Sequence, residues 1–511
     1  MDLTLINAPQ MVALSNYLST VVIPPLGTAY LAAFVRKAGY EVKILDAIGS
    51  GMKRLSKYRD FYLRGISFDE IVEKINPDTR VIGIGCMFST QWPSVCDLIK
   101  LIKKRHPGIP IILGGEHCTG LPEFCLKKSP ADACVLGEGE EALLDLIRFY
   151  LTGSPSMENI KGTAFRKSDG SIQIQSERAR ITAIDDLPRP AWDLIDVEQY
   201  IDYNQPHGAT KGRSIPMLAT RGCPYQCTFC SNASMWTTKW IARNPKAVVD
   251  EMEEYMRKYR ANDFHFEDLT AIIKKDWVMT FCNEILDRGM KISWQLPSGT
   301  RSEAIDLECA IMMKKAGCHH FAYAPESGSM ETLQIIRKKV NLDRLFQSAR
   351  DAMKAEIRVQ CFFILGFPHE RAKHIWETFK VIFKCAWTGI SEVHISAFAP
   401  YPNCELFHQL QADGKIPELS DEYFFALYGQ DDLLRRKSYN DRISSGMLAV
   451  LIWMGYITFF GSYYLMRPHR FISSILGSED GGGKLAKIIK GTFKNLQDML
   501  RVRVPVKNSQ A

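Results

Sequence analysis

Three closely spaced cysteines give this sequence its most specific chemical signal. They stand in the run Arg221-Gly222-Cys223-Pro224-Tyr225-Gln226-Cys227-Thr228-Phe229-Cys230, a C-x3-C-x2-C pattern that follows a strand-like segment. Tetrahedral zinc requires four ligands, commonly as two C-x2-C pairs, and neither a second pair nor a nearby H-x3–5-H follows. A 4Fe–4S cluster normally takes four cysteines, so three would leave one iron open to a small molecule. Cysteine is scarce, at 14 of 511 residues, which disfavours a chance grouping of core cysteines.

Two blocks of alternating strand and helix patterns position this motif. Residues 1–150 contain short β-type apolar runs with helical patterns between them, and residues 211–415 repeat the alternation six times. This predicts an α/β chain, in which a doubly wound, Rossmann-like sheet precedes a partial (β/α)6 barrel of the TIM type. Ligands of both folds lie at the carboxyl ends of the strands. Residues 151–210 are expected to connect the two units, and residues 416–511 to form a helical C-terminal region.

Composition excludes several classes of protein. The chain has 46% hydrophobic and 24% charged residues, which is ordinary globular usage and argues against a disordered chain, a collagen or a polytopic membrane protein. Its net charge of +7 is too mild to argue for nucleic acid. The first residues lack the pattern of a secretory signal, so we expect reduced thiols in a cytoplasmic enzyme.

The cysteine motif, with Phe229 before its last cysteine, resembles the signature of the radical S-adenosylmethionine (SAM) superfamily. The resemblance implies that Cys223, Cys227 and Cys230 hold a 4Fe–4S cluster whose open iron binds SAM. It also implies that one electron cleaves SAM to methionine and a 5′-deoxyadenosyl radical, which removes a hydrogen atom from the substrate. In such enzymes the protein positions and shields the cofactors. Barrel positions that resemble SAM contacts less specifically are Phe229, Glu267, Asp268, Glu326, Ser327 and Gly366.

Residues 1–150 resemble the cobalamin-binding domain that precedes the barrel in one large radical SAM subgroup. The matching segments are residues 24–31, 114–117, 137–141 and 185–192, so the resemblance spans about residues 1–415. No G-x-G-x-x-G follows the first strand, which argues against a dinucleotide. The strand-end loops supply the candidate cobalamin contacts, which are Asn7, Pro9, Ser89, Thr90, Gly114, Gly115, Glu116, His117, Gly137, Glu138, Gly139 and Glu140.

One histidine in that set departs from a known cobalt-ligating pattern. His117 and Gly120 keep the H-x-x-G spacing of the motif D-x-H-x-x-G, but Gly115 stands where the motif has aspartate. The subgroup that the chain resembles commonly binds cobalamin without a protein histidine on cobalt. We therefore predict that His117 is not a cobalt ligand.

The C-terminal region joins an uncharged stretch to a basic one. Residues 443–466 contain no charged residue, and this stretch is long enough to span a membrane, but a helix packed on the barrel or lying at the membrane interface is the favoured alternative. Residues 484–500 place lysines beside apolar residues at helical spacing, as in a membrane-surface helix or a solvated helix packed on the domain. Residues 467–511 hold nine Lys/Arg and three Asp/Glu, so they carry most of the net charge. Contact with the inner face of an anionic membrane is therefore an open alternative to a purely cytoplasmic location.

The resemblance implies a cobalamin-dependent radical SAM enzyme. The first expectation is a methyltransferase that places a SAM-derived methyl group on an unactivated carbon, and the basic C-terminal residues favour a hydrophobic small molecule or lipid as substrate. The alternatives are a non-methylating enzyme that forms a ring or a carbon–carbon bond, like the anaerobic magnesium-protoporphyrin ester cyclase, and a cobalamin-binding sensor or scaffold. An electron donor of the flavodoxin or ferredoxin type is the expected partner. No motif identifies the substrate.

Overall fold

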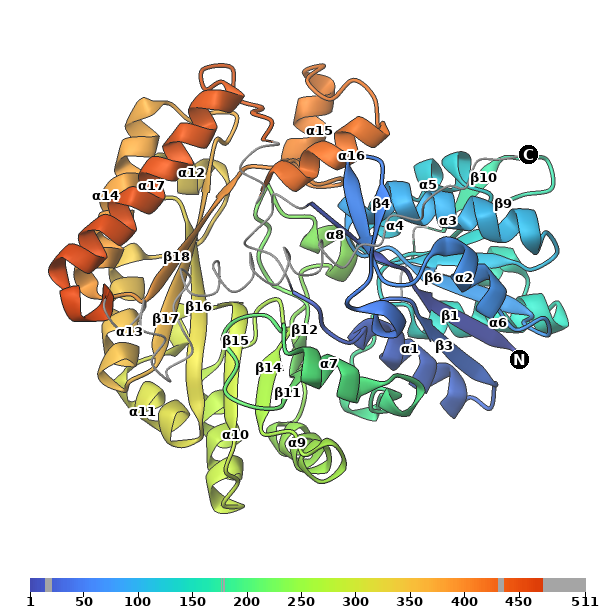
Figure 1. Ribbon diagram of the computed structural model, residues 1–511, viewed down its shortest axis with the longest axis horizontal. Helices are drawn as coiled ribbons and strands as arrows, with labels where there is room; N and C mark the ends of the chain where they lie inside the picture. The colour runs from blue at the N-terminus through green and yellow to red at the C-terminus, as the bar shows by residue number, and fades with distance from the viewer. Residues whose placement is uncertain (14–20, 176, 178–179, 431–435, 472–511) are drawn as a thin grey trace, which may run out of the picture.

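The chain folds into two α/β units that lie side by side (Figure 1). The computed structural model describes residues 1–13, 21–175, 177, 180–430 and 436–471. In Figure 1 the N-terminal unit is blue to cyan, and the second unit, in yellow and orange, curves as an open barrel. This is the fold class that the sequence predicts.

The N-terminal unit is built on one mostly parallel sheet. Its strands are β1 (Leu3–Asn7), β3 (Val42–Asp46), β6 (Val81–Gly85), β7 (Ile111–Gly114), β8 (Ala133–Val135), β9 (Thr163–Arg166) and β10 (Ile172–Ile174). Their order in space is β10-β9-β8-β7-β6-β1-β3, and all pairs from β8 to β3 are parallel. The central strands are continuous apolar runs because helices cover both faces of such a sheet. These helices are α1 (Leu26–Lys37), α2 (Phe68–Lys74), α3 (Trp92–Arg105), α4 (Glu116–Gly120), α5 (Pro122–Lys128) and α6 (Glu140–Thr152), and a small antiparallel sheet adds β2 (Gln10–Val12), β4 (Leu55–Tyr58) and β5 (Phe61–Arg64).

Residues 151–210 do more than connect the two units, contrary to the sequence-based expectation. β9 and β10 extend the first sheet as antiparallel strands. Helix α7 (Val197–Tyr203) packs on the same unit, where the Tyr200 hydroxyl donates to the buried carboxylate of Asp46 at 2.8 Å. The two strands are only four and three residues long, so they carry too little apolar alternation to be recognised from sequence.

The second unit is a parallel sheet of six strands with helices on its outer side. The strands follow the order β11 (Ser214–Met217), β14 (Asp263–Phe266), β15 (Ser293–Thr300), β16 (Cys318–Glu326), β17 (Arg358–Leu365) and β18 (Glu392–Ala397). A separate two-stranded sheet joins β12 (Thr220–Arg221) to β13 (Ile241–Ala242). The helices of this unit are α8 (Asn232–Trp236), α9 (Pro245–Tyr259), α10 (Lys275–Asp287), α11 (Leu307–Lys315), α12 (Met330–Ile335), α13 (Leu342–Lys354) and α14 (Ala372–Thr388).

The last described elements tie the two units together and complete the barrel wall. They are α15 (Glu405–Ala412), α16 (Asp421–Ala426), η7 (Leu427–Gln430) and α17 (Ser445–Met466). The hydroxyl of Tyr428 donates to the carbonyl of Met11 at 2.6 Å, so η7 returns to the first unit. Helix α17 packs on β18, where the Tyr456 hydroxyl lies 3.0 Å from the backbone nitrogen of Ile395. The alternative of a packed helix is thus the arrangement observed for residues 445–466.

Helix α17 is also long and apolar enough to cross a membrane, judged by length and composition alone. No other helix of the described residues meets that test. A core helix of a soluble protein passes it as well, and one face of α17 is buried against the barrel.

The close packing of α17 on the barrel predicts different costs for two glycine substitutions. A Cβ on Gly455 would lie 2.7 Å from Ile395 Cδ1, whereas a Cβ on Gly461 would meet no atom within 4 Å. We expect Gly455→Leu to destabilise the protein by about 1–3 kcal/mol through overpacking. Gly461→Leu, the matched control, is expected to leave stability unchanged or raise it, because leucine favours a helix more than glycine does. Thermal unfolding midpoints check this, and equal midpoints for the two variants would show that α17 does not pack as described.

Candidate functional site

The cysteine loop begins at a short strand that is held by a buried carboxylate. Asp268 accepts hydrogen bonds from the N–H groups of Ala219, at 3.1 Å, and of Thr220, and from the Thr220 hydroxyl at 2.6 Å. Burial raises the pKa of Asp268 to about 6, against the lowering effect of these donors. Both carboxylate oxygens of Asp268 are engaged by these donors. Asp268 therefore positions the start of the cysteine loop, whereas the sequence predicted that it contacts SAM.

The first residue of the loop must be glycine. Gly222 has φ of +86°, and a Cβ there would lie 2.2 Å from the carbonyl oxygen of Lys239. Cys223 and Cys227 follow as half-buried free thiols, and Cys230 is a free thiol on an exposed residue. The Thr270 hydroxyl lies 3.5 Å from the Cys223 sulfur. The loop thus presents three thiols that no disulfide blocks.

These thiols suit a cluster better than a single ion. Among the described residues no group of three His, Cys, Asp or Glu could hold one metal ion. In a 4Fe–4S cluster each cysteine binds its own iron, so the thiolates need not converge on one point. Burial raises the pKa of Cys227, Lys338 lowers it, and the nearby Cys223 raises it again. A bare thiolate is therefore unfavourable here, and bound iron would replace the proton.

The middle of the loop is fixed from two further elements. The N–H of Thr228 donates to the carbonyl of Ile336 at 3.1 Å, and the carbonyl of Thr228 accepts from the N–H of Leu406 at 3.0 Å. The ring of Phe229 packs edge-on against Phe367, with 5.6 Å between centroids. Phe229 therefore connects the cysteine loop to the turn that follows β17.

The turns after β16 and β17 hold the predicted SAM contacts in different ways. Glu326 has φ of +66°, a strained conformation of the kind found at functional sites, and its carboxylate accepts from Lys338 at 2.8 Å. Ser327 is fully buried and its hydroxyl bonds to Thr378 at 3.0 Å, so it fixes the turn and faces no ligand. The N–H of Gly366 donates at 2.7 Å to Glu370, a buried carboxyl group whose pKa burial raises to about 8.

Glu267 lies at the end of β14 between two histidines. His207 Nδ1 is 2.7 Å and His265 Nδ1 2.8 Å from its carboxylate oxygens. Although burial opposes ionisation, the charges and hydrogen bonds of the two histidines lower the pKa of Glu267 to about 2. Glu267 is therefore a fixed negative charge, as a contact for the SAM amino group requires. His207, which comes from residues 151–210, was not singled out by any pattern in the sequence.

A buried ion pair joins the cysteine loop to the N-terminal unit. The guanidinium of Arg221 donates to Glu138 at 3.1 Å and to Glu140 at 2.7 Å, and it lies over the rings of Tyr30 and Trp236. The three charged side chains are 8%, 1% and 5% exposed. The carboxylates of Glu138 and Glu140 are thus enclosed by protein and paired with Arg221, in place of the cobalamin contact predicted for these two residues. The acidic side chain of Glu116 makes a second link, since it accepts from the hydroxyl of Ser231.

Glycines leave the carboxyl edge of the first sheet without side chains at the ends of β6 and β7. Gly85 and Gly114 are register partners at the ends of β6 and β7, and a Cβ on Gly85 would meet no atom within 4 Å. Gly115, with φ of +104°, would place a Cβ 2.6 Å from the carbonyl oxygen of Cys86. Beside this bare edge the side chains of Met87 and Phe88 are exposed. An open, side-chain-free edge with apolar neighbours fits a large flat ring such as a corrin, and neither Gly85, Met87 nor Phe88 was singled out from sequence.

The other candidates at this edge are divided between accessible and buried positions. The amide of Asn7 donates to Asp46 at 2.7 Å, and Pro9 is buried. Ser89 and Thr90 are buried, and Ser89 Oγ lies 2.9 Å from His117 Nδ1. Gly137, with φ of +78°, donates its N–H to Thr119 at 2.9 Å, and Gly139 packs on Leu31. Direct cobalamin contact by these residues stays a prediction.

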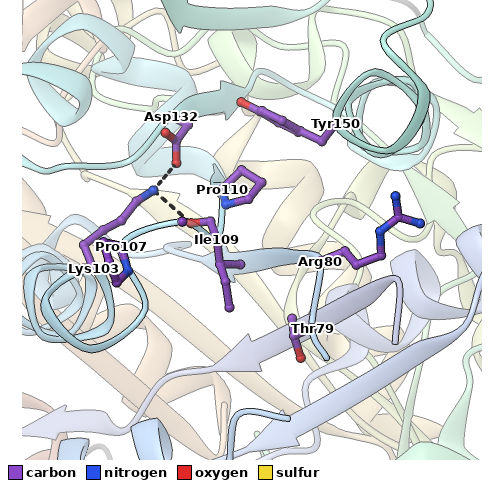
Figure 2. Close-up of a pocket in the computed structure, with 9 residues that line it drawn as sticks. Thr79, Arg80, Lys103, Pro107, Ile109, Pro110, Asp132 and Tyr150 are labelled. Atoms are coloured by element: carbon purple, nitrogen blue, oxygen red, sulfur yellow. Dashed lines mark hydrogen bonds and ion pairs between the residues drawn. The ribbon is translucent and has the colours of Figure 1, made fainter. Parts of the chain in front are cut away.

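The described residues also form a cavity of about 540 Å³ at the opposite edge of the same sheet (Figure 2). In Figure 2 the ammonium group of Lys103 lies between Asp132 and the carbonyl of Ile109, at 2.8 Å from each. Its lining residues precede the strands, whereas the cysteine loop and the glycine edge follow them. This cavity is therefore separate from the candidate site.

Comparison with known proteins identifies both units. Residues 18–147 match the B12 binding domain and residues 217–382 the radical SAM superfamily. The chain is 32% identical over 375 residues to cytidylyl-2-hydroxyethylphosphonate methyltransferase of Streptomyces wedmorensis, covering 67% of this chain and 69% of that protein. It is 26% identical to anaerobic magnesium-protoporphyrin IX monomethyl ester cyclase of Rubrivivax gelatinosus, covering 83% and 72%. The solved structure of OxsB with aqua-cobalamin and S-adenosylmethionine bound matches 98% of this chain and 79% of that one, with a TM-score of 0.67 and 14% identity.

This chain therefore belongs to the B12-binding-domain-containing radical SAM enzyme family. The predicted fold class and the predicted cofactors, a 4Fe–4S cluster, SAM and cobalamin, are confirmed. The expectation of a radical SAM enzyme is confirmed as well. Methyltransferases among the relatives support the first of the expected activities, which is methyl transfer. As a radical SAM enzyme it acts on a small-molecule substrate and needs a reductant.

The buried ion pair predicts a marked asymmetry between single and combined substitutions. Arg221→Gln leaves Glu140 buried without its cation and Glu138 with Arg180 alone, at 3.4 Å, which we expect to destabilise the protein by about 3–5 kcal/mol. The double variant Arg221→Met, Glu140→Gln should regain most of that loss, because Glu138 keeps Arg180 and no buried charge remains unpaired. Chemical denaturation measures both.

The matched control for the Arg221 substitutions is Arg36→Gln. Arg36 pairs with Asp193 at 2.6 Å, but both side chains are more than 40% exposed, so the loss should be below about 1 kcal/mol. Equal losses for Arg36→Gln and Arg221→Gln would contradict the assignment of a buried interdomain ion pair.

The environment of His117 predicts that cobalamin spectra do not depend on it. Burial between the rings of Trp92 and Phe424 lowers the pKa of His117 to about 4, so the ring is neutral at physiological pH. Its Nδ1 is engaged by Ser89. We expect His117→Ala to bind cobalamin with an unchanged spectrum, and His117→Gln to do so if the alanine variant is unstable. Loss of a nitrogen axial ligand in the spectrum of either variant would show that His117 ligates cobalt.

Proposed function

We propose that this enzyme is a cobalamin-dependent radical SAM methyltransferase that places a SAM-derived methyl group on an unactivated carbon of a hydrophobic small molecule or lipid. One observation carries the proposal. Arg221 immediately precedes the cysteine loop and pairs with Glu138, on the loop that follows β8, and with Glu140, the first residue of α6. The site for SAM cleavage and the edge suited to cobalamin are thus joined by a buried contact, as a reaction that uses both cofactors requires.

The residues of the chain position and shield the reacting groups. When bound, the cluster and SAM supply the radical that removes a substrate hydrogen, and cobalamin supplies the methyl group. Cys223, Cys227 and Cys230 hold the cluster, and Glu267 offers a fixed negative charge at the end of β14. Glu326, held by Lys338, stands at the end of β16, and the charges of both side chains act on the Cys227 thiol. Keeping substrate and both cofactors in one geometry is the protein's main contribution to the rate.

The partners and location form the finer part of this proposal. A flavodoxin- or ferredoxin-type protein is the electron donor, since the cluster takes one electron for each SAM cleaved. The enzyme is cytoplasmic and lies at the inner face of an anionic membrane. Support for the membrane comes from the charge distribution, because residues 467–511 contain nine Lys/Arg and three Asp/Glu.

Anaerobic turnover with methyl-deuterated SAM tests the function. The reconstituted enzyme is incubated with dithionite and a lipid extract from a strain that lacks the gene. We expect 5′-deoxyadenosine together with a product that carries the deuterated methyl group. Cys227→Ala should reduce both to background, whereas Cys96→Ala, which alters a buried cysteine on α3 outside the site, should retain them.

Two other outcomes would contradict the methyltransferase proposal. Deoxyadenosine formed with an unlabelled, altered product would favour the cyclase reaction of the 26% identical relative. No deoxyadenosine from a protein with full iron content would favour a cobalamin-binding sensor or scaffold.

A further inference from the structure

Helix α17 carries an apolar face that the described residues leave uncovered. Met447, Val450, Trp453, Met454, Ile457 and Leu465 are between 46% and 85% exposed. At the pitch of an α-helix these six positions fall on one side, whereas Leu448, Ile452 and Phe459 on the other side are buried against the barrel. The helix contains no charged residue, so its outer side offers solvent only apolar and small uncharged groups.

A neighbouring helix extends this face with aromatic residues and lysines. Trp376, Phe383 and Trp387 of α14 are exposed, and Lys380 stands among them at helical spacing. The two helices run side by side in Figure 1, and their ends are joined by Arg467, which donates to the carbonyls of Ala386 and Trp387 at 2.8 and 3.0 Å. We name the outward residues of both helices the α14–α17 face.

We propose that the α14–α17 face docks on the surface of an anionic phospholipid bilayer, with both helices lying in the interfacial plane. Contiguous exposed apolar surface of this kind marks an interaction site on a protein. Tryptophan is enriched at membrane interfaces, and a lysine stem can lie on apolar surface while its ammonium group reaches the headgroups. The inference rests on the proposed membrane location and names the surface responsible.

Charge distinguishes the bilayer from a second copy of the chain. Exposed Arg470 follows α17, and residues 472–511 add seven Lys/Arg and three Asp/Glu. Anionic headgroups would attract this positive charge, whereas a second copy of the chain would carry the same net positive charge. The bilayer is therefore the occupant that the charges favour.

The packing of α17 also argues for lying on the membrane over crossing it. Gly455 is fixed against Ile395 of β18, so the helix is part of the barrel wall and a span would carry that wall into lipid. At its start, Leu448 lies against Gly366, where a Cβ would come within 2.9 Å of it. The face thus lies directly behind a turn of the candidate site, which is a suitable place to receive a membrane-borne substrate.

Vesicle flotation of the full-length reconstituted enzyme tests the proposal. The probes are vesicles of phosphatidylcholine alone and of phosphatidylcholine with phosphatidylglycerol. The test variant is Val450→Glu with Ile457→Glu, and Val450→Ser with Ile457→Ser replaces it if the first does not fold. The matched control is Leu286→Glu with Ile311→Glu, which places two charges on exposed apolar positions of α10 and α11.

We expect the enzyme to float with the anionic vesicles, and the test variant to lose about tenfold or more of that binding because charges are costly at the apolar boundary. The control should bind like the parent. Deoxyadenosine formation, measured without vesicles, should be the same in all three, so a failure of the proposed reaction is recorded separately. Three results would overturn the proposal: no flotation of the parent, full binding by the test variant, or binding that depends on residues 472–511 and not on the face. A dimer of the parent that the test variant converts to monomer would also overturn it.

Discussion

Burial of Arg221 between two carboxylates is the constraint on which the site depends. Charged groups removed from water are costly unless each is paired and hydrogen-bonded. Here Glu138 also accepts the N–H of Ile181, and Arg180 lies 3.4 Å from Glu138, so two cations face two anions. Trp236 covers both guanidinium groups. Because any sliding of one unit against the other would separate these charges in a dry environment, the ion pairs fix the distance between the two cofactor regions.

Glycine shapes both sides of this contact, for different reasons. On the cysteine side Gly222 allows the carbonyl of Lys239 to approach the backbone closely, immediately after Arg221. On the sheet side Gly85 and Gly114 remove side chains from the ends of two paired strands, and Gly115 allows close approach to Cys86. Gly222 thus positions the cysteine ligands, whereas Gly85, Gly114 and Gly115 leave room for a bound cofactor. The ion pair holds the cysteine loop close to this edge of the sheet, as a reaction that uses two large cofactors requires.

The sequence could predict elements whose signal is local. Apolar runs alternating with helical patterns identified the two α/β units, and the cysteine spacing located the loop. It could not tell whether a polar residue at a strand end faces a ligand or the fold. Asp268, Ser327 and Glu138 were expected at cofactors, yet they hold Thr220, Thr378 and Arg221. Such pairings join residues about 50 to 80 positions apart, so only the three-dimensional arrangement reveals them.

The same limit explains the uncharged stretch of residues 443–466. From sequence, an apolar run of this length suggests either a membrane span or a buried helix. In the structure one side of α17 is buried in the barrel wall and the other is exposed, so neither description accounts for both sides. An ordinary barrel helix would place charged residues outward. Helix α17 has no charged residue on its outer side, and the neighbouring helix α14 exposes Trp376 and Trp387. The barrel therefore carries an exposed apolar surface directly behind Gly366. Such a surface carries a risk of aggregation unless a partner covers it, and its position ties that partner to the catalytic unit.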